Sequence, residues 1–196
     1  MDNSDFVYHA NPHSWFLVAD DLHSQAEKIM NSYGTGSLSR KDYRTGQIEN
    51  WDNTSRSAFL LASFALENII KAFLIYEPTD WISNGTLSRK LRTHNLKSLA
   101  ENSSLLPYKE RSLKILSEFN EGNEYWARYP CGLNKDSTAD PSKMTEKLWS
   151  RYRWLIGSFA KRLVNLLRKY WKGPYGFHGK FEIGGRFLGV DFDNLA

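Results

Sequence analysis

Apolar residues recur at steps of three and four along three long stretches of this chain, which is the spacing of one face of an α-helix. The stretches cover residues 14–30, 54–76 and 143–171. The first places these residues on one face: Trp15, Val18, Ala19, Leu22, Ala26 and Ile29. The second is apolar on nearly every side, so it predicts a helix that is buried on several sides. The third carries one long apolar stripe, which begins at Leu148 and ends at Leu167.

Proline, glycine and asparagine divide the remaining sequence. A short helix is predicted over residues 94–101, and Pro107 opens another, since proline is tolerated in the first turn. Residues 31–53 are rich in Gly, Ser, Asn and Asp and predict a loop. Asn84-Gly85 predicts a turn, and residues 130–141 predict a second loop.

The last part of the chain changes character at Gly173. Residues 180–183 and 186–192 alternate as strands do, and Gly184-Gly185 lies between them, so we expect a β-hairpin with a Gly-Gly turn. A lone hairpin is marginally stable in water, so it should pack on the helices or on a second chain. The sequence therefore predicts an all-α domain over residues 1–172, followed by a Gly-rich tail over residues 173–196.

Charge is distributed unevenly along the 196 residues, whose formal net charge is +4. Residues 1–50 carry four Lys and Arg against seven Asp and Glu, whereas residues 143–180 carry ten against one. A basic segment of this kind attracts phosphate, although a solvated helix face has the same composition. Both interpretations stay open.

Several classes of protein are disfavoured by what the sequence contains. A single cysteine, Cys131, cannot form an internal disulfide or a cysteine-based zinc site, which favours a reducing compartment. The polar N-terminal residues do not have the pattern of a signal peptide. Glu67 and Lys71 interrupt the most apolar helix, so we expect a core helix, no membrane span and a cytoplasmic protein. No motif for a metal or a cofactor is apparent.

Three segments in order resemble the HEPN family (higher eukaryotes and prokaryotes nucleotide-binding). Residues 61–72, LASFALENIIKA, are similar to its AxxALExxxKA helix. Residues 94–99, HNLKSL, are similar to its HDLxxL helix start, and residues 125–130, YWARYP, to the RYP of one bacterial branch. The resemblance covers roughly residues 14–170. It implies a four- to five-helix up-and-down bundle, which is often dimeric.

Many members of that family are metal-independent ribonucleases, and the resemblance implies an Arg and a His separated by four to six residues. Arg89 and His94 have this spacing. A histidine can accept the proton of the RNA 2′-hydroxyl, and an arginine can stabilise charge on the phosphate. However, His94 stands where the family has a structural histidine, so capping or packing is the alternative for it.

Arg128 is a second candidate, as a catalytic or an RNA-binding residue, because aromatic residues such as Tyr129 flank it. Arginine and aromatic rings together stack bases and hold phosphates. The alternative is an ion pair between Arg128 and Glu67 or another acid inside the bundle. Glu67 and Lys71, four residues apart, are interpreted as a structural ion pair.

The basic segment supplies further candidates for phosphate contacts. These are Arg151, Arg153, Lys161, Arg162, Arg168 and Lys169. Aromatic residues lie between them, which suits single-stranded nucleic acid, and of these Tyr170 and Trp171 are expected to be exposed.

Three functions remain open at this stage. The favoured one is an RNA- or nucleotide-binding module, catalytically weak or inactive, in a toxin–antitoxin or phage-defence system; this setting comes from the resemblance alone. The second is a metal-independent endoribonuclease. The third is a dimeric scaffold whose basic face binds an acidic protein partner. A homodimer is expected, because an exposed strand edge invites pairing.

Overall fold

The computed structural model describes residues 2–32, 37–52, 54–77, 81–124, 126–129, 131, 134–138 and 144–194. The described chain is mostly helical with small antiparallel strand pairs. The helices are α1 (Asn3–Ala10), α2 (Pro12–Asn31), α3 (Thr54–Tyr76), the 3-10 turn η1 (Arg89–Arg92), α4 (Leu96–Glu101), α5 (Glu110–Glu124), α6 (Lys135–Thr138) and α7 (Glu146–Leu167).

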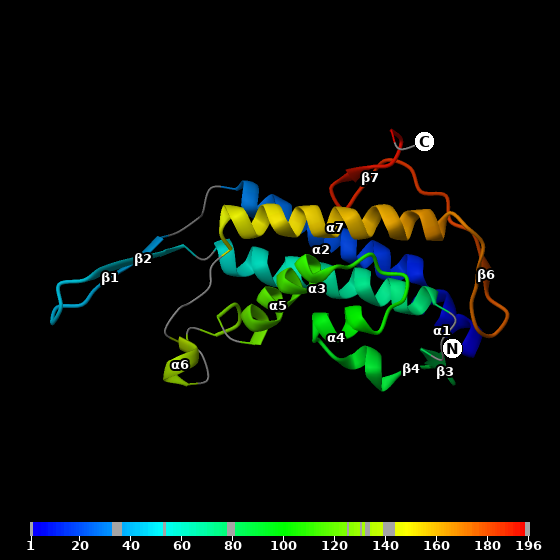
Figure 1. Cartoon of the computed structure of the whole chain (residues 1–196), viewed down its shortest axis with the longest axis horizontal. Helices are drawn as coiled ribbons and strands as arrows, with labels where there is room; N and C mark the ends of the chain where they lie inside the picture. The colour runs from blue at the N-terminus through cyan, green and yellow to red at the C-terminus, as the bar shows by residue number, and fades with distance from the viewer. Residues whose placement is uncertain are drawn as a thin grey trace.

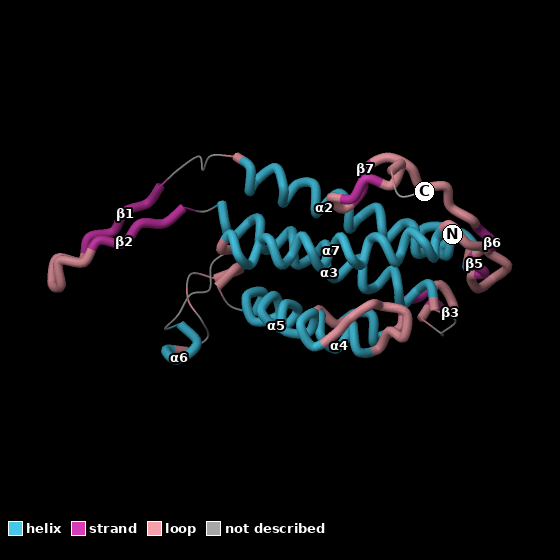
Figure 2. Tube along the Cα trace, turned by 45° about the horizontal axis from the view of Figure 1, so that its top comes forward, coloured by secondary structure: helices cyan, strands magenta, loops and turns pink. Residues whose placement is uncertain are grey.

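Helix α3 lies at the centre of the helical body. Helices α2 and α7 run alongside it, and α4 and α5 pack against another side of it (Figure 1) (Figure 2). Its length and apolar composition would suffice to cross a membrane, but most of it is buried inside the protein. Helix α3 is therefore the core helix that its all-round apolar pattern predicts, which is consistent with a soluble protein.

The long helices lie close to their predicted positions, with two corrections at their faces and ends. The buried face of α2 holds Phe16, Ala19 and Ala26, whereas Val18, expected inside, is 48% exposed. Helix α7 ends at Leu167 rather than at residue 171, and Trp171 turns back into the core, where its indole N–H donates to the Tyr76 carbonyl. Trp171 is thus buried, contrary to expectation, while Tyr170 is exposed.

Helix α1 was not predicted from the sequence. Its start is a capping box, in which the Asp2 carboxylate accepts from the Asp5 backbone N–H and the Asp5 carboxylate accepts from that of Asp2. Only Val7 and Ala10 are buried on it, so the segment lacks the long apolar stripe by which the other helices are recognised.

Residues 31–53 contain a hairpin where a loop was expected. Strand β1 (Ser37–Lys41) pairs antiparallel with β2 (Ile48–Asp52), and Lys41 faces Ile48 at the closed end. The Asp42 carboxylate accepts from the backbone N–H groups of Arg44 and Thr45, which closes the turn. The hairpin extends away from the helices (Figure 1).

The expected turn at Asn84-Gly85 is present. It joins β3 (Ile82–Ser83) to β4 (Thr86–Leu87), and both of its residues have positive φ, as a tight two-residue hairpin requires.

The C-terminal tail forms two small hairpins rather than the predicted one. Strand β5 (Trp171–Lys172) pairs with β6 (His178–Gly179), and β7 (Arg186–Phe187) pairs with β8 (Val190–Asp191). The second turn is Leu188-Gly189, so the prediction of a Gly184-Gly185 turn was wrong.

The tail packs on the helical body, which was expected as one alternative to packing on a second chain. Arg168 at the end of α7 donates to the Ile183 carbonyl at 2.7 Å and to the Phe192 carbonyl at 3.4 Å. Ile183, Leu188 and Phe192 are buried and belong to the same core cluster as the helices.

Candidate functional site

The candidate site begins with two charged residues on the core helix α3. Glu67 and Lys71 lie one turn apart on α3, both nearly fully buried, and the Lys71 ammonium is 2.6 Å from a Glu67 carboxylate oxygen. The ammonium also lies 5.7 Å from the centroid of the Trp15 ring on α2, a distance at which a cation is attracted to an aromatic face. In so apolar a helix each charge needs the other, because an unpaired buried charge is very costly.

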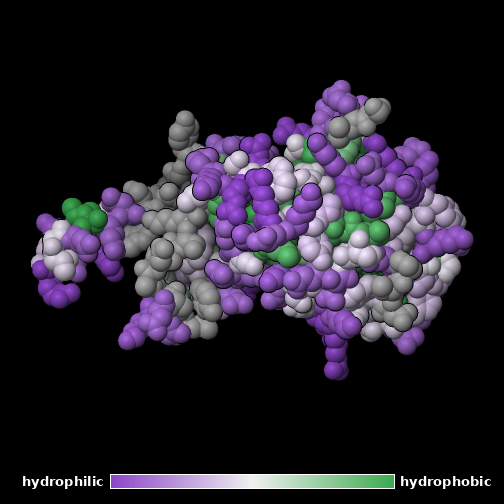
Figure 3. Space-filling view, in the orientation of Figure 1, coloured by the Kyte–Doolittle hydropathy of each residue, from purple (hydrophilic) through white to green (hydrophobic). Residues whose placement is uncertain are grey.

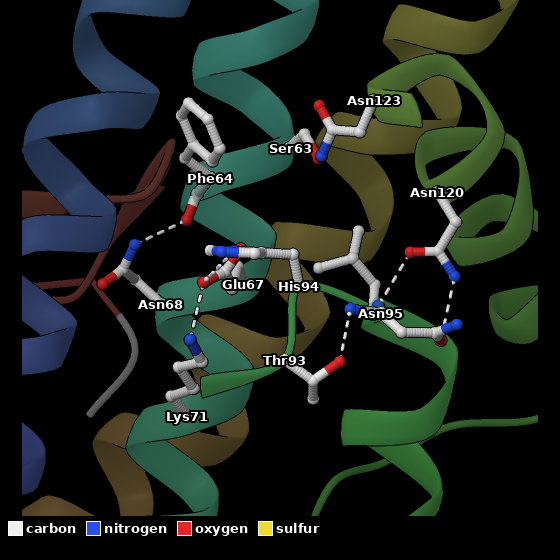
Figure 4. A network of polar contacts seen from close by, with 11 residues as sticks. Ser63, Phe64, Glu67, Asn68, Lys71, Thr93, His94, Asn95, Asn120 and Asn123 are labelled. Atoms are coloured by element: carbon white, nitrogen blue, oxygen red, sulfur yellow. Dashed lines mark hydrogen bonds and ion pairs between the residues drawn. The ribbon is translucent and has the colours of Figure 1, made fainter. Parts of the chain in front are cut away.

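His94 completes this cluster from a different part of the chain. Its Nδ1 is 3.0 and 3.2 Å from the two carboxylate oxygens of Glu67, while its side chain is 65% exposed (Figure 4). Since the carboxylate paired with Lys71 can only accept, Nδ1 carries a hydrogen, and in the neutral form of the ring Nε2 is the acceptor. The structure therefore presents an imidazole whose Nε2 can take a proton at the protein surface.

The backbone around His94 is held by a network of amides. Asn95 caps α4 by accepting from the Ser98 backbone N–H, and Asn120 of α5 accepts from the Leu96 backbone N–H at 2.7 Å. The Asn120 amide also donates to the Asn95 side chain at 3.0 Å (Figure 4). The start of α4 is thus tied to α5, which fixes the position from which His94 reaches Glu67.

Three cations precede His94 in the turn η1. Arg89, Lys90 and Arg92 are exposed, whereas Leu91 between them is buried and anchors the turn. Arg92 donates to the Leu87 carbonyl, and among the described residues the side chains of Arg89 and Lys90 form no hydrogen bond or ion pair. Arg89 and His94 share one surface region by chain proximity, but no hydrogen bond joins them within the described part of the chain.

Arg128 and Tyr129 lie in the turn after α5, and both are exposed. Arg56 of α3 holds this turn by donating to the backbone carbonyls of Trp126 and Tyr129. Among the described residues Glu67 has Lys71 and His94 as partners, so the alternative of an Arg128–Glu67 pair is not what the structure shows.

The cations of α7 divide into two groups. Arg151 forms an ion pair with Glu118 at 2.7 Å, Arg153 forms one with Glu27 at 3.3 Å, and Arg168 is used by the tail. These three therefore have structural partners that compete with phosphate. Lys161, Arg162 and Lys169 are exposed and form no ion pair within the described ranges.

Polar residues cover most of the described surface on the face shown in Figure 3, where apolar residues appear only in small separate patches. In the described chain no group of His, Cys, Asp and Glu residues has the arrangement of a metal site.

Sequence reasoning paired Glu67 with Lys71 but did not connect His94 to this pair. Glu67 was assigned to Lys71, with Arg128 as an alternative partner, and at a separation of 27 residues no periodic signal pairs Glu67 with His94. Asn95 could have been found as a helix cap, because asparagine directly precedes the apolar start of α4. Asn120 and Arg56 gave no signal, since their partners are distant in sequence.

Comparison with known proteins assigns no role to these residues. No protein-family model matches the chain, and neither the curated proteins nor the solved structures gave a match.

Proposed function

We propose that this chain is a HEPN-like helical protein that binds RNA or a nucleotide through its phosphates, at the surface formed by Arg89, Lys90, Arg92 and His94. The observation that carries the proposal is the group of exposed cations beside an imidazole that a buried carboxylate orients. We include in the proposal the up-and-down arrangement of the bundle, a homodimeric state, a cytoplasmic location and a role in toxin–antitoxin or phage defence, all of which the resemblance suggests.

Electrostatics supports a phosphate ligand at this surface. Arg89 and Lys90 keep their full donor capacity for an external ligand, because neither is engaged within the described chain. An arginine binds phosphate with two parallel hydrogen bonds, and a lysine binds it as a point charge. The exposed cations Lys161 and Arg162 on α7, with Lys169 just after its end, offer a second surface that a longer RNA strand could reach.

The salt dependence of binding tests this proposal. Each phosphate contact to single-stranded nucleic acid contributes about 0.7 to the slope of log K against log salt. Replacing Arg89, Lys90 and Arg92 with Gln should therefore reduce the slope by about 2. The assay is fluorescence anisotropy of a labelled mixed-sequence RNA over a series of salt concentrations.

A matched control removes the same charge elsewhere. Lys28, Arg44 and Lys109 are exposed on other elements, and their replacement with Gln should leave the slope unchanged. If both triple variants lost the same amount of slope, net charge alone would account for the attraction of RNA, and a site at η1 would be contradicted. No binding even at low salt would contradict the proposed function altogether.

A second function, metal-independent RNA cleavage, is favoured by the contact between His94 and Glu67. The carboxylate keeps Nδ1 protonated, so Nε2 is free to act as a general base toward a 2′-hydroxyl. Arg89 or Arg128 would then stabilise the charge that develops on the phosphate.

Incubation with RNA in EDTA separates the two functions. His94→Gln should abolish cleavage while leaving the anisotropy signal, whereas His9→Ala, at another exposed histidine, should cleave as the wild type does. Binding without cleavage in the wild type would exclude the nuclease and leave the binding module. Cleavage retained in His94→Gln would remove His94 from the reaction.

A further inference from the structure

A pocket of about 250 Å³ is lined by residues that do not belong to the Glu67–His94 network. It is formed by His23 of α2, by Ser150, Arg153, Trp154 and Gly157 of α7, and by the turn of the β7–β8 hairpin. The elements that enclose it come from the two ends of the chain. Nothing in the RNA-binding proposal uses any of these residues.

The floor of the pocket is a buried histidine with one unsatisfied ring nitrogen. His23 is 2% exposed, and its Nδ1 is 2.8 Å from the hydroxyl of Tyr152, which is fully buried. Its Nε2 is buried and without a hydrogen-bond partner among the described residues. The nearest carboxylate oxygen, on Glu27, is 3.8 Å from Nε2, which is too far for a hydrogen bond.

The tautomer of His23 follows from the needs of Tyr152. Among the described residues, His23 is the one hydrogen-bond partner of the Tyr152 hydroxyl, so this hydroxyl must donate to Nδ1 or leave its own hydrogen without an acceptor. Burial lowers the pKa of His23 to about 4, so the ring is neutral at neutral pH. Its single hydrogen is therefore on Nε2, and a buried donor faces the pocket.

Two glycines stand in the pocket wall beside this buried donor. Gly189 has a φ of +74°, and a Cβ there would lie 3.3 Å from Nε2, so any side chain at this position would crowd the donor. Gly157 on α7 also lacks a side chain at the pocket wall. The absence of both side chains makes the space that the pocket occupies.

The rest of the pocket wall contains an aromatic ring, Trp154, and a cation, Arg153. Trp154 lines the pocket, and the guanidinium of Arg111, 4.5 Å from its ring centroid, holds the indole in place. Arg153 lines it as well, and the Arg153 Nε pairs with Glu27 at 3.3 Å, which leaves the other guanidinium N–H groups for a ligand. Arg186 is a second cation near Glu27, at 4.0 Å, so two guanidinium groups share that one carboxylate.

We propose that this pocket binds a small aromatic carboxylate, with its ring against Trp154 and a carboxylate oxygen accepting from His23 Nε2–H and from Arg153. A flat ring fits an indole wall, and a carboxylate satisfies both the orphaned donor and the shared guanidinium groups. Ser150 at the rim supplies a further hydroxyl donor.

The test is an NMR titration of the ¹⁵N-labelled chain with benzoate. Before any ligand is added, the ring nitrogens should show hydrogen on Nε2 of His23; hydrogen on Nδ1 would overturn the argument. Benzoate should then shift the His23 Nε2 and Trp154 indole signals with a dissociation constant on the order of 1 mM, as for a probe of this small size. Cyclohexanecarboxylate, which lacks the flat ring, should bind at least threefold more weakly.

Variants separate this site from general surface binding. His23→Asn keeps an acceptor for the Tyr152 hydroxyl but lacks the Nε2 donor, and it should lose at least tenfold in benzoate affinity. Trp154→Leu is a second variant, to be used if His23→Asn does not fold, and its affinity for benzoate should also fall. Lys41→Gln, exposed on the β1–β2 hairpin that extends away from the helices, should bind as the wild type does. Unchanged binding in both His23→Asn and Trp154→Leu, or no shift in the wild type, would overturn the proposal.

Discussion

The buried residue His23 should make the stability of this protein depend on pH. Burial is the largest cause that lowers its pKa from 6.5 to about 4, and the nearby cations Arg153 and Arg186 lower it further, while Glu27 opposes them. Between pH 4 and 6.5 the unfolded chain binds a proton at this histidine that the folded chain does not. Folded stability therefore rises with pH through this window, is fully developed near pH 7, and is lost as the pH falls toward 4.

The size of the effect follows from the shift. A difference of 2.5 pKa units corresponds to about 3 kcal/mol, because one unit is about 1.4 kcal/mol. Between pH 7.5 and 4.5 the linkage relation gives a loss of about 2.5 kcal/mol from His23 alone. Such a loss is a large fraction of the stability of a typical domain, which is about 5–15 kcal/mol.

The assay is urea unfolding of the wild type and of His23→Asn at pH 4.5, 5.5, 6.5 and 7.5. Asn keeps an acceptor for the Tyr152 hydroxyl but does not titrate, so its stability should fall less steeply below pH 6.5. Other groups whose pKa values shift, such as His13 and Asp20, are the same in both proteins and cancel in the comparison. Parallel stability curves for the two proteins would refute the reasoning.

Three further predictions concern the core and the tail. Lys71→Met should lower the free energy of unfolding by about 3–5 kcal/mol, because it leaves Glu67 buried without its ammonium partner; Glu67→Leu in addition should restore most of the loss in the same denaturation assay. Gly122→Ala should destabilise the fold by about 1–3 kcal/mol, because the new Cβ would lie 2.2 Å from the Phe59 ring. Gly157→Ala on α7 should instead stabilise it by up to about 1 kcal/mol, because alanine favours a helix and the new Cβ makes only an ordinary contact, so the melting temperatures of the two variants should shift in opposite directions. Arg168→Met should loosen the tail, which hydrogen exchange would show as faster exchange confined to residues 183–192; unchanged exchange there would mean that the apolar contacts of the tail suffice.

The positions of the long helices could be predicted because the pattern that forms them is local. Apolar residues at helical spacing define α2, α3 and α7 whatever they pack against, and Pro78 or Asn11 marks an end within a turn or two. The same local chemistry predicted the Asn84-Gly85 turn, since both residues tolerate positive φ.

The C-terminal hairpin shows where local chemistry is insufficient. Gly184-Gly185 has the stronger turn composition, yet the turn of β7–β8 forms at Leu188-Gly189, where Leu188 takes a φ of +50°. Leu188 is buried, and its backbone N–H donates to the Asp20 carboxylate at 2.6 Å. Contacts with α2, more than 160 residues away in the chain, thus offset a backbone conformation that leucine rarely adopts.

The candidate sites follow the same division. The sequence by itself determined the helical character of the chain, the ion pair spacing of Glu67 and Lys71, and the exposure of a basic segment, because these depend on residues within one or two turns of each other. Only the tertiary structure decided that His94 reaches Glu67, that Arg151 and Arg153 are engaged by acids of other helices, and that His23 has an unsatisfied donor over a pocket. Each of these depends on which helix faces lie together, and that is set by packing of the whole core, which no local pattern encodes.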